Sequence, residues 1–285
     1  IADAYERVNK SVSYSVSLYQ GAEFQLMKGL IWSANVQGEL KVNRNDQLIR
    51  GDLVSSGISS GSNDAKIPRK LSAETYINFA RDFKDHSVGA MFGTSVEDWR
   101  DETFHLEGSD YVSESILTSN AQQVKDLTKT KTTYESHAMA SFFGRVNYSL
   151  YSRYLFTFTF RGDGSSRFAP GNRWGYFPSG AFAWNFSEEP FMKRVSFIST
   201  GKLRTSYGET GNNRVSDFSY YPSIGLPIAS CYSFNNGTPT RGFIPSGISN
   251  SELKWERTGQ FDIGVDLGFF RDRVQLTVDW YQKIT

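Results

Sequence analysis

A run of alternating apolar and polar residues over positions 141–186 constrains the fold of this chain most strongly. Its centre, residues 154–161, reads YLFTFTFR, so that phenylalanines alternate with threonines and an arginine. A period of two is typical of a strand with one apolar and one polar face. The alternation also covers residues 142–150 and 182–186. We therefore predict three strands of about ten residues each, joined by a tight turn at 150–153 and a longer loop at 162–173.

The same pattern recurs through the rest of the chain, over residues 11–19, 30–41, 71–83, 87–99, 202–207, 261–269 and 274–280. Together with the central three, these segments predict an all-β antiparallel fold of about ten strands. Residues 187–190 read SEEP and predict one short helical turn that ends before Phe197. Ser187 suits an N-cap, and the acidic residues and the proline suit a first turn.

The composition agrees with strands that are apolar on one side only. Hydrophobic residues make up 39% of the chain, yet it has 22 Phe and 15 Tyr. The net charge of +1 gives no electrostatic argument for a polyanion, so we expect no nucleic-acid partner. No apolar run is long enough for a transmembrane helix. The single cysteine, Cys231, excludes an internal disulfide.

The predicted connections differ in length in a regular order. Those at 25–29, 83–86, 150–153, 186–201 and 269–273 are short or moderate, whereas those at 43–70, 102–135, 162–173 and 211–256 are mostly long. Outer-membrane barrels have short periplasmic turns and long extracellular loops. A soluble β-sandwich has no reason to place its long loops at one end. The chain therefore reads as a transmembrane antiparallel β-barrel.

The distribution of charge over the two faces supports a barrel in lipid. The polar face carries most of the charges, among them Glu39, Arg145, Arg161, Arg204, Asp262 and Asp266. A charge on a lipid-facing position costs about 2–4 kcal/mol at mid-membrane, which explains an apolar face almost without charges. An open sheet would leave edge amides unpaired in hydrocarbon. We therefore expect this chain to be part of a longer polypeptide that supplies the remaining strands.

Several phrases occur in a fixed order in the second half of the chain. They are FGRVNY from Phe143, RGDGSSRF from Arg161, GYFPS before Trp184, SEEPFM from Ser187, LRTSYGETGN over 203–212 and the strand that begins WERTGQFDIG at Trp255. Together they resemble the barrel of TonB-dependent outer-membrane transporters of the SusC/RagA type. The resemblance covers about residue 141 to the end. It implies that residues 1–285 are part of a barrel of about 22 strands, with an N-terminal plug and TonB box outside this chain.

The resemblance also implies a function. It implies active import of an oligosaccharide or oligopeptide across the outer membrane of a Gram-negative bacterium. Import would be driven by TonB through the plug, assisted by a SusD-like surface lipoprotein lid, and would need no cofactor. A passive porin-like channel, a surface-binding barrel and an outer-membrane barrel enzyme are the alternatives. We expect no catalytic residues and no metal site, because there is no G-x-S-x-G motif and the three histidines lie far apart.

Candidate cargo contacts are residues that we place on the polar face near loops: Arg161, Arg173, Phe177 and Gln260. The DGSSR motif adds Asp163, Gly164 and Arg167. Either the arginines bind cargo or plug, or Asp163-Gly164 forms a turn and Arg161 pairs with neighbouring acids; we favour the second interpretation. Asn212 and Asn213 open the longest loop, where we expect them to turn the chain first and to contact a lid second.

Five aromatic residues, Trp174, Tyr176, Trp184, Trp255 and Trp280, could stack on sugars. Alternatively, Trp174, Tyr176, Trp184 and Trp280 could form the aromatic girdle that barrels place at the membrane interfaces. Parity puts Trp174, Tyr176 and Trp184 on the apolar face with Phe158. We therefore favour the girdle.

Overall fold

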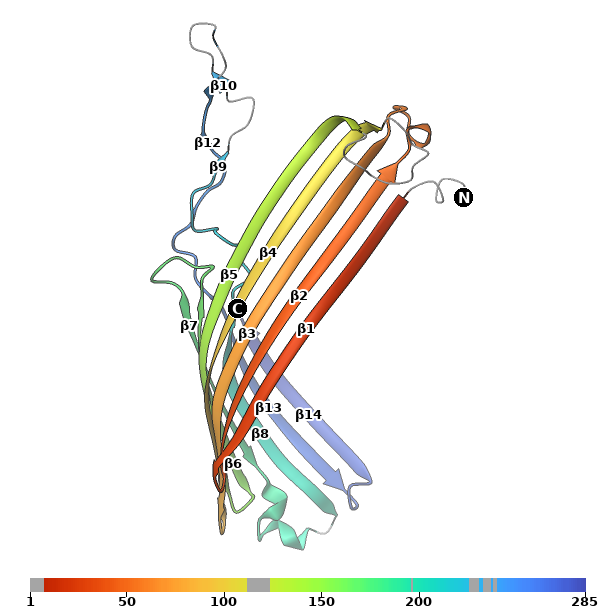
Figure 1. Cartoon of the computed structure of the whole chain (residues 1–285). Coiled ribbons are helices and arrows are strands. Elements are labelled where there is room, and N and C mark those ends of the chain that lie inside the picture. The colour runs from red at the N-terminus through yellow and green to blue at the C-terminus, as the bar shows by residue number, and fades with distance from the viewer. Residues whose placement is uncertain (1–7, 112–123, 196, 226–230, 233–236, 238–239) are drawn as a thin grey trace. The chain divides into compact units, whose positions relative to one another are not determined.

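The structure, a computed structural model, describes residues 8–111, 124–195, 197–225, 231–232, 237 and 240–285 (Figure 1). Ten strands form one sheet in the order β1-β2-β3-β4-β5-β6-β7-β8-β13-β14. They are β1 (Val8–Met27), β2 (Leu30–Ile49), β3 (Ser60–Phe83), β4 (His86–Tyr111), β5 (Val124–Leu150), β6 (Tyr154–Ser165), β7 (Trp174–Trp184), β8 (Ile198–Asn212), β13 (Glu256–Phe269) and β14 (Val274–Ile284). The predicted all-β class and the ten antiparallel strands are confirmed. Among the described residues, no helix is long and apolar enough to cross a membrane.

The chain divides into two compact units. Unit 1 comprises Ile1–Gly21, Asn35–Ala73 and Glu97–His137, and unit 2 comprises Ala22–Ala34, Glu74–Val96 and Ala138–Thr285. Five strands, β1 to β5, contribute to both units, whereas β6 to β14 belong to unit 2 alone.

Unit 1 corrects two predicted loops. Residues 43–49 belong to β2, 60–70 to β3, 102–111 to β4 and 124–135 to β5, while residues 112–123 lie outside the described part. Ion pairs tie β3 to β4 at Lys66–Asp101 (3.2 Å), Arg69–Glu102 (3.0 Å) and Lys70–Glu97 (3.2 Å). The prediction failed because these strand segments are polar on both faces, so their sequence does not alternate between apolar and polar residues. They still form backbone hydrogen bonds and cross-strand charge pairs.

The remaining connection between β2 and β3, residues 50–59, contains the short 3-10 helix η1 (Gly51–Leu53). Leu48 and Tyr111 are buried beside it, and the Tyr111 amide donates to Ser59 Oγ at 2.9 Å. Unit 1 therefore has a small packed end, where strands β2, β3 and β4 meet.

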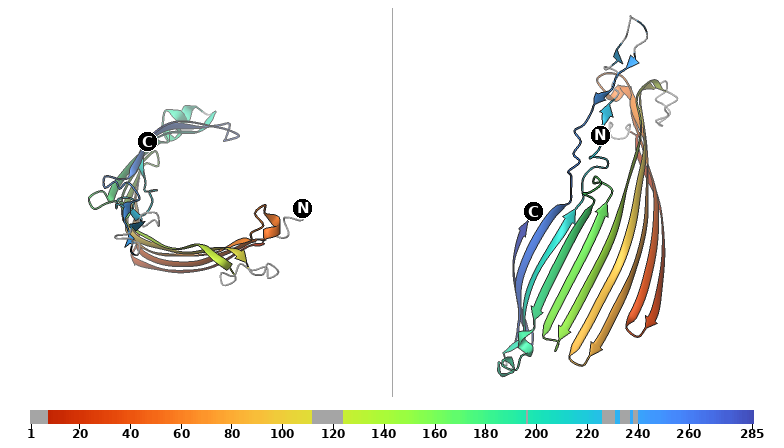
Figure 2. Two further views of the ribbon diagram at one scale, coloured as in Figure 1. Left: turned by 90° about the horizontal axis from the view of Figure 1, so that it is seen from above. Right: turned by 90° about the vertical axis from the view of Figure 1, so that its left-hand side faces the viewer.

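Unit 2 contains the short turns, which Figure 2 shows at one end of its strands. The first turn is only Lys28-Gly29, because β1 continues to Met27. Gly29 has a φ of +82°, and a Cβ there would collide with the Ala80 carbonyl. The turns at 84–85, 151–153 and 270–273 are also short, as predicted. The strand length was wrong for β5, which has 27 residues, whereas β6 and β7 have 12 and 11.

The predicted helical turn is present as two 3-10 helices, η3 (Phe186–Glu188) and η4 (Met192–Arg194). Ser187 is not its N-cap: that position is Asn185, which makes no side-chain capping bond. The predicted long loop at 211–256 is shortened at both ends by β8 and β13. It contains two small pairs, β9 (Ile224–Gly225) with β12 (Ile244–Pro245) and β10 (Cys231–Tyr232) with β11 (Thr240–Arg241).

The strand register of unit 2 separates the two faces of the sheet. On β6, Phe158 lies opposite Val146 and Gly180. Phe158 is 54% exposed and Val146 46%, whereas Thr157 and Arg161 on the other face are half-buried. An exposed face of large apolar side chains is what contact with lipid requires.

Candidate functional site: the polar face and the base of the long loop

A charge network joins the last three strands on the polar face. Arg204 on β8 donates to both oxygens of Asp266 on β13 at 2.7 and 2.9 Å, and to Asp279 Oδ1 on β14 at 2.9 Å. The Thr277 hydroxyl also donates to Asp266, at 3.1 Å. Gly264 lies between these groups, where a Cβ would collide with the Asp279 carboxylate. The glycine therefore leaves room for the charges to cross β13.

A recess of about 330 Å³ lies beside this network. Its polar lining includes Thr157, Lys202, Arg204, Ser206, Asp262 and Asp279. Gln260, a predicted cargo contact, donates to Asp262 at 2.9 Å. Hydroxyl, amide, carboxylate and ammonium groups thus lie together on the polar face. They can hydrogen-bond a polar molecule without selecting strongly for a positive or a negative charge.

Arg161, another predicted cargo contact, is paired within its own strand and with β5. Its Nε donates to both Asp163 oxygens at 2.8 and 2.9 Å, and a second nitrogen donates to Ser141 Oγ at 3.0 Å. The guanidinium also lies over the Phe143 ring. Arg161 does pair with a neighbouring acid, as expected, but with Asp163 of its own strand and not across the wall. The expected Asp163-Gly164 turn is wrong because both residues lie inside β6.

Polar residues connect the end of β6 to the start of the long loop. Arg167 Nε donates to Asp217 Oδ1 at 2.7 Å, and its Nη1 donates to the Asn213 carbonyl at 3.4 Å. Asn213 in turn donates to Ser165 Oγ at 3.3 Å. Asp217 is the partner that the sequence did not reveal, because it lies within the polar loop and carries no motif of its own.

Apolar residues continue this connection. Phe168, Phe177 and Trp255 form a buried cluster, with the Trp255 ring centroid 5.5 Å from that of Phe168 and 5.4 Å from that of Phe177. Trp255 Nε1 donates to the Arg173 carbonyl at 2.8 Å, and Arg173 Nε donates to the Phe168 carbonyl at 3.2 Å. We call Arg167, Phe168, Phe177, Asn213, Asp217 and Trp255 the loop base.

The structure therefore divides the predicted site residues. Phe177 belongs to the loop base, where its ring is buried, and Arg173 is hydrogen-bonded to Trp255 and Phe168 of the same cluster. Arg161 and Gln260 lie on the polar face of β6 and β13. Asn212 ends β8 and donates to Glu256 at 2.8 Å. Contact of any of them with cargo stays a prediction.

The predicted girdle residues share the apolar face. Trp174 and Tyr176 begin β7, are 47% and 45% exposed, and contact the Phe142 ring. Trp184 ends the same strand, and Trp280 on β14 lies opposite Ile263. Aromatic residues thus mark both ends of β7 on one face. Their place at the membrane interfaces stays a prediction.

Glu189 joins two neighbouring turns at the other end of unit 2. Its buried carboxylate accepts hydrogen bonds from Tyr154 Oη at 2.6 Å, Trp184 Nε1 at 3.2 Å and Arg153 Nη1 at 3.4 Å. Sequence reasoning read Glu189 only as an acid suited to a helix start. The hydrogen bonds from Tyr154 and Trp184, with the nearby Arg153 charge, hold the pKa of Glu189 below its usual value.

Glu189→Gln is expected to destabilise the folded protein at neutral pH. Because the folded pKa is lowered, the ionised carboxylate stabilises the fold above its unfolded pKa of about 4.3, and this contribution is lost as the pH falls through the folded value. The thermal unfolding midpoint of Glu189→Gln should thus lie below wild type at pH 7 and approach it at pH 3. Glu188→Gln, in the adjacent exposed position, should match wild type at pH 7; equal midpoints for both variants there would contradict this role.

The histidines are separated. His86 bonds Tyr148, His105 bonds Asp64, and His137 stacks on Trp99. In the part of the chain that the structure describes, no group of three His, Cys, Asp or Glu residues is arranged to hold a metal ion.

An antiparallel sheet with an exposed apolar face, a hydrogen-bonded polar face and short turns at one end is a transmembrane β-barrel wall. The chain belongs to the TonB-dependent receptor β-barrel family, because residues 3–284 match the family described as TonB dependent receptor-like, beta-barrel. This confirms the resemblance seen in the sequence.

Relatives of known name agree with this family. The chain is 32% identical to TonB-dependent receptor P39 of Formosa agariphila over 100% of its own length and 27% of that protein. It is 35% identical to TonB-dependent receptor SusC of Bacteroides thetaiotaomicron over 75% of its length and 21% of that protein. The structure of the RagAB peptide transporter superposes with a TM-score of 0.86 at 22% identity, over 98% of this chain and 31% of that one. The chain thus spans less than a third of these relatives.

Proposed function

We propose that this chain is part of the barrel wall of an importer that moves a nutrient oligomer across the outer membrane of a Gram-negative bacterium. In this proposal the apolar face of unit 2 contacts lipid, and the polar face with the Arg204 network lines the lumen. A plug and a TonB box elsewhere in the polypeptide couple transport to TonB. A SusD-like lipoprotein closes the outer mouth.

The observation that carries the proposal is the contrast between the two faces of the sheet. The apolar face of unit 2 exposes residues such as Phe158 and Val146, and its charges, such as Arg81, Glu209 and Arg257, lie towards strand ends. The opposite face holds a continuous set of paired charges and hydroxyl groups. A water-filled, polar lumen inside a lipid-facing wall accounts for both.

The polar face also supports the proposed class of cargo. The recess beside Arg204 offers hydrogen-bond donors and acceptors, together with charges of both signs, from Ser206, Asp262 and Lys202. Such a wall suits a molecule with many hydroxyl or amide groups, which is why we propose an oligosaccharide or an oligopeptide. Two similar proteins are named TonB-dependent receptor SusC and RagAB peptide transporter. The proposal extends the receptor and transporter functions in these names to this chain.

Uptake by the full-length protein should depend on energy coupling. Cells that carry the gene are expected to take up a fluorescent oligosaccharide or oligopeptide, and cells without either the gene or TonB are expected to lose this uptake. Deletion of the neighbouring SusD-like lipoprotein should reduce it. A passive porin-like channel would keep its uptake without TonB, and a barrel enzyme would release cleaved products outside the cell; either result would contradict the proposal.

A further inference from the structure

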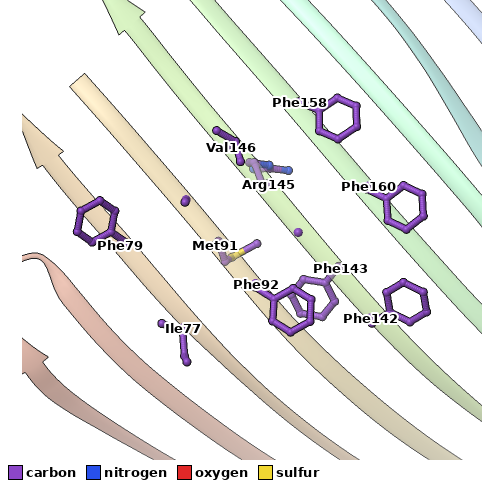
Figure 3. Close-up of a pocket in the computed structure, with 12 residues that line it drawn as sticks. Ile77, Phe79, Met91, Phe92, Phe142, Phe143, Arg145, Val146, Phe158 and Phe160 are labelled. Carbon is purple, nitrogen blue, oxygen red and sulfur yellow. The ribbon is translucent and has the colours of Figure 1, made fainter. Parts of the chain in front are cut away.

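The apolar face of unit 2 is not smooth: a groove of about 580 Å³ crosses strands β3 to β6 (Figure 3). Ala90 on β4 and Gly144 on β5 supply its small residues. Ile77 and Phe79 border it on one side, and Phe158 and Phe160 on the other, as Figure 3 shows. The groove thus has small residues between borders of large apolar side chains.

Gly144 keeps the floor of this groove open. It lies opposite Phe160 in the β5–β6 register, and the nearest atoms that a Cβ would meet are the Met91 carbonyl oxygen at 3.5 Å and Phe92 at 3.8 Å. These are ordinary van der Waals distances, so a side chain would fit there. A large apolar residue would fill space that the wild-type protein leaves to another molecule.

The groove is lined almost wholly by apolar side chains. Arg145 is the one charged residue among its lining residues. Its Nε donates to Thr159 Oγ1 at 3.3 Å, and both residues alternate with the apolar positions of β5 and β6. An apolar chain without charge or hydrogen-bonding groups therefore suits this lining.

Cationic and hydrogen-bonding groups continue the same face towards the short-turn end. Side chains alternate between the two faces along β3, so Arg81 shares the face of Phe79, two residues and about 7 Å further along the strand. The exposed Arg81 guanidinium lies over the Phe83 ring at 4.9 Å. His86 Nδ1 and Tyr148 Oη are hydrogen-bonded at 2.7 Å nearby on β4 and β5.

We propose that this surface binds one glycerophospholipid, with an acyl chain in the groove and the phosphate beside Arg81. An acyl chain matches the apolar lining, and a phosphate anion is complementary to the guanidinium. The inference rests on the proposed function, because the short-turn end must be periplasmic for the headgroup to belong to the inner leaflet of the outer membrane, where phospholipid is found.

The test is native mass spectrometry of the full-length protein in detergent, titrated with phosphatidylglycerol and with a diacylglycerol of the same chains. Gly144→Leu should lower the affinity for both lipids at least tenfold by filling the floor. Arg81→Gln should lower the affinity for phosphatidylglycerol alone, by about tenfold, the loss of one charge-assisted hydrogen bond. Gly180→Leu is the matched control. It places the same side chain on the same face, where a Cβ would meet nothing within 4 Å, and should bind like wild type.

Three outcomes would overturn the inference: unchanged binding in Gly144→Leu, an equal loss of both lipids in Arg81→Gln, or retention of lipid A in place of phospholipid. If Gly144→Leu does not assemble, Ala90→Leu fills the same floor and takes its place. Heat-modifiable migration on gels separates the two proposals. A wild-type protein that lacks it is not a membrane barrel and contradicts the proposed function, whereas an assembled barrel that binds no phosphatidylglycerol contradicts only the lipid site.

Discussion

Replacing Trp255 with alanine should release the base of the long loop and leave the ten-stranded sheet intact. The Trp255 side chain is 9% exposed and packs on the rings of Phe168 and Phe177. Its truncation should cost about 3–5 kcal/mol of local stability. It also removes the Nε1 hydrogen bond to the Arg173 carbonyl. This loss lowers the local stability further if no water molecule replaces the indole as hydrogen-bond donor. Among the contacts described above, the hydrogen bonds of Arg167 to Asp217 and Asn213 and of Asn213 to Ser165 would then still tie the start of the loop to the end of β6.

The measurement is limited proteolysis of the full-length protein in intact outer membranes, with the cleavage rate within residues 213–255 as the readout. Trp255→Ala should be cleaved much faster than wild type. Phe243→Ala changes a 73% exposed aromatic on the same loop and should be cleaved at the wild-type rate. Identical rates for Trp255→Ala and wild type would show that the cluster does not hold the loop.

A second variant reaches the same cluster from the backbone. A Cβ on Gly211 would collide with the Phe177 ring, which is buried and therefore not free to move away. Gly211→Val should thus reproduce the proteolytic phenotype of Trp255→Ala. Agreement between the two variants would assign the effect to the packing of Phe177 and not to the indole hydrogen bond.

The sequence predicted the strands well where one face is apolar and the other polar. Phe156, Phe158 and Phe160 alternate with polar residues because the two sides of β6 meet different surroundings. The far ends of β3 and β4 lack this signal, since Lys66, Arg69 and their partners stand where both faces are polar. Backbone hydrogen bonds and charge pairs between residues far apart in sequence hold these strands together. From composition alone, such polar segments are interpreted as loops.

The site was predictable in its residue types but not in its pairings. Arg167 stood out through its motif, yet its partner Asp217 is separated from it by strands β7 and β8 and the turn between them, and nothing local marks it. Glu189 was noticed for its charge and position in SEEP, whereas its role depends on Tyr154 and Trp184, which the sheet brings to the same end. Trp255 was considered as a sugar platform, but it closes a core that only the antiparallel order of β7, β8 and β13 assembles.

Phe158→Arg should impair assembly of the barrel far more than Thr157→Arg, although the two positions are adjacent. Phe158 lies between Val146 and Gly180 on the exposed apolar face. An arginine there has no carboxylate beside it in the register and should cost about 2–4 kcal/mol if the position is at mid-membrane.

Thr157 faces the other way, into different chemistry. Its hydroxyl donates to Asn147 at 3.0 Å, and it lines the recess that also contains Asp262 and Asp279. An arginine at this position remains in a polar environment with carboxylates within the same recess, so its cost should be small. The contrast between the variants therefore depends on the assignment of the faces and not on the size of the new side chain.

The two variants are best compared in the full-length protein by heat-modifiable migration and by urea unfolding from the membrane. We expect Phe158→Arg to lose most of the folded band and Thr157→Arg to keep it. The reverse order, or equal loss in both, would mean that the phenylalanine face does not meet hydrocarbon. The lumen proposed for the Arg204 network and the lipid site proposed at Gly144 would then both be on the wrong side of the sheet.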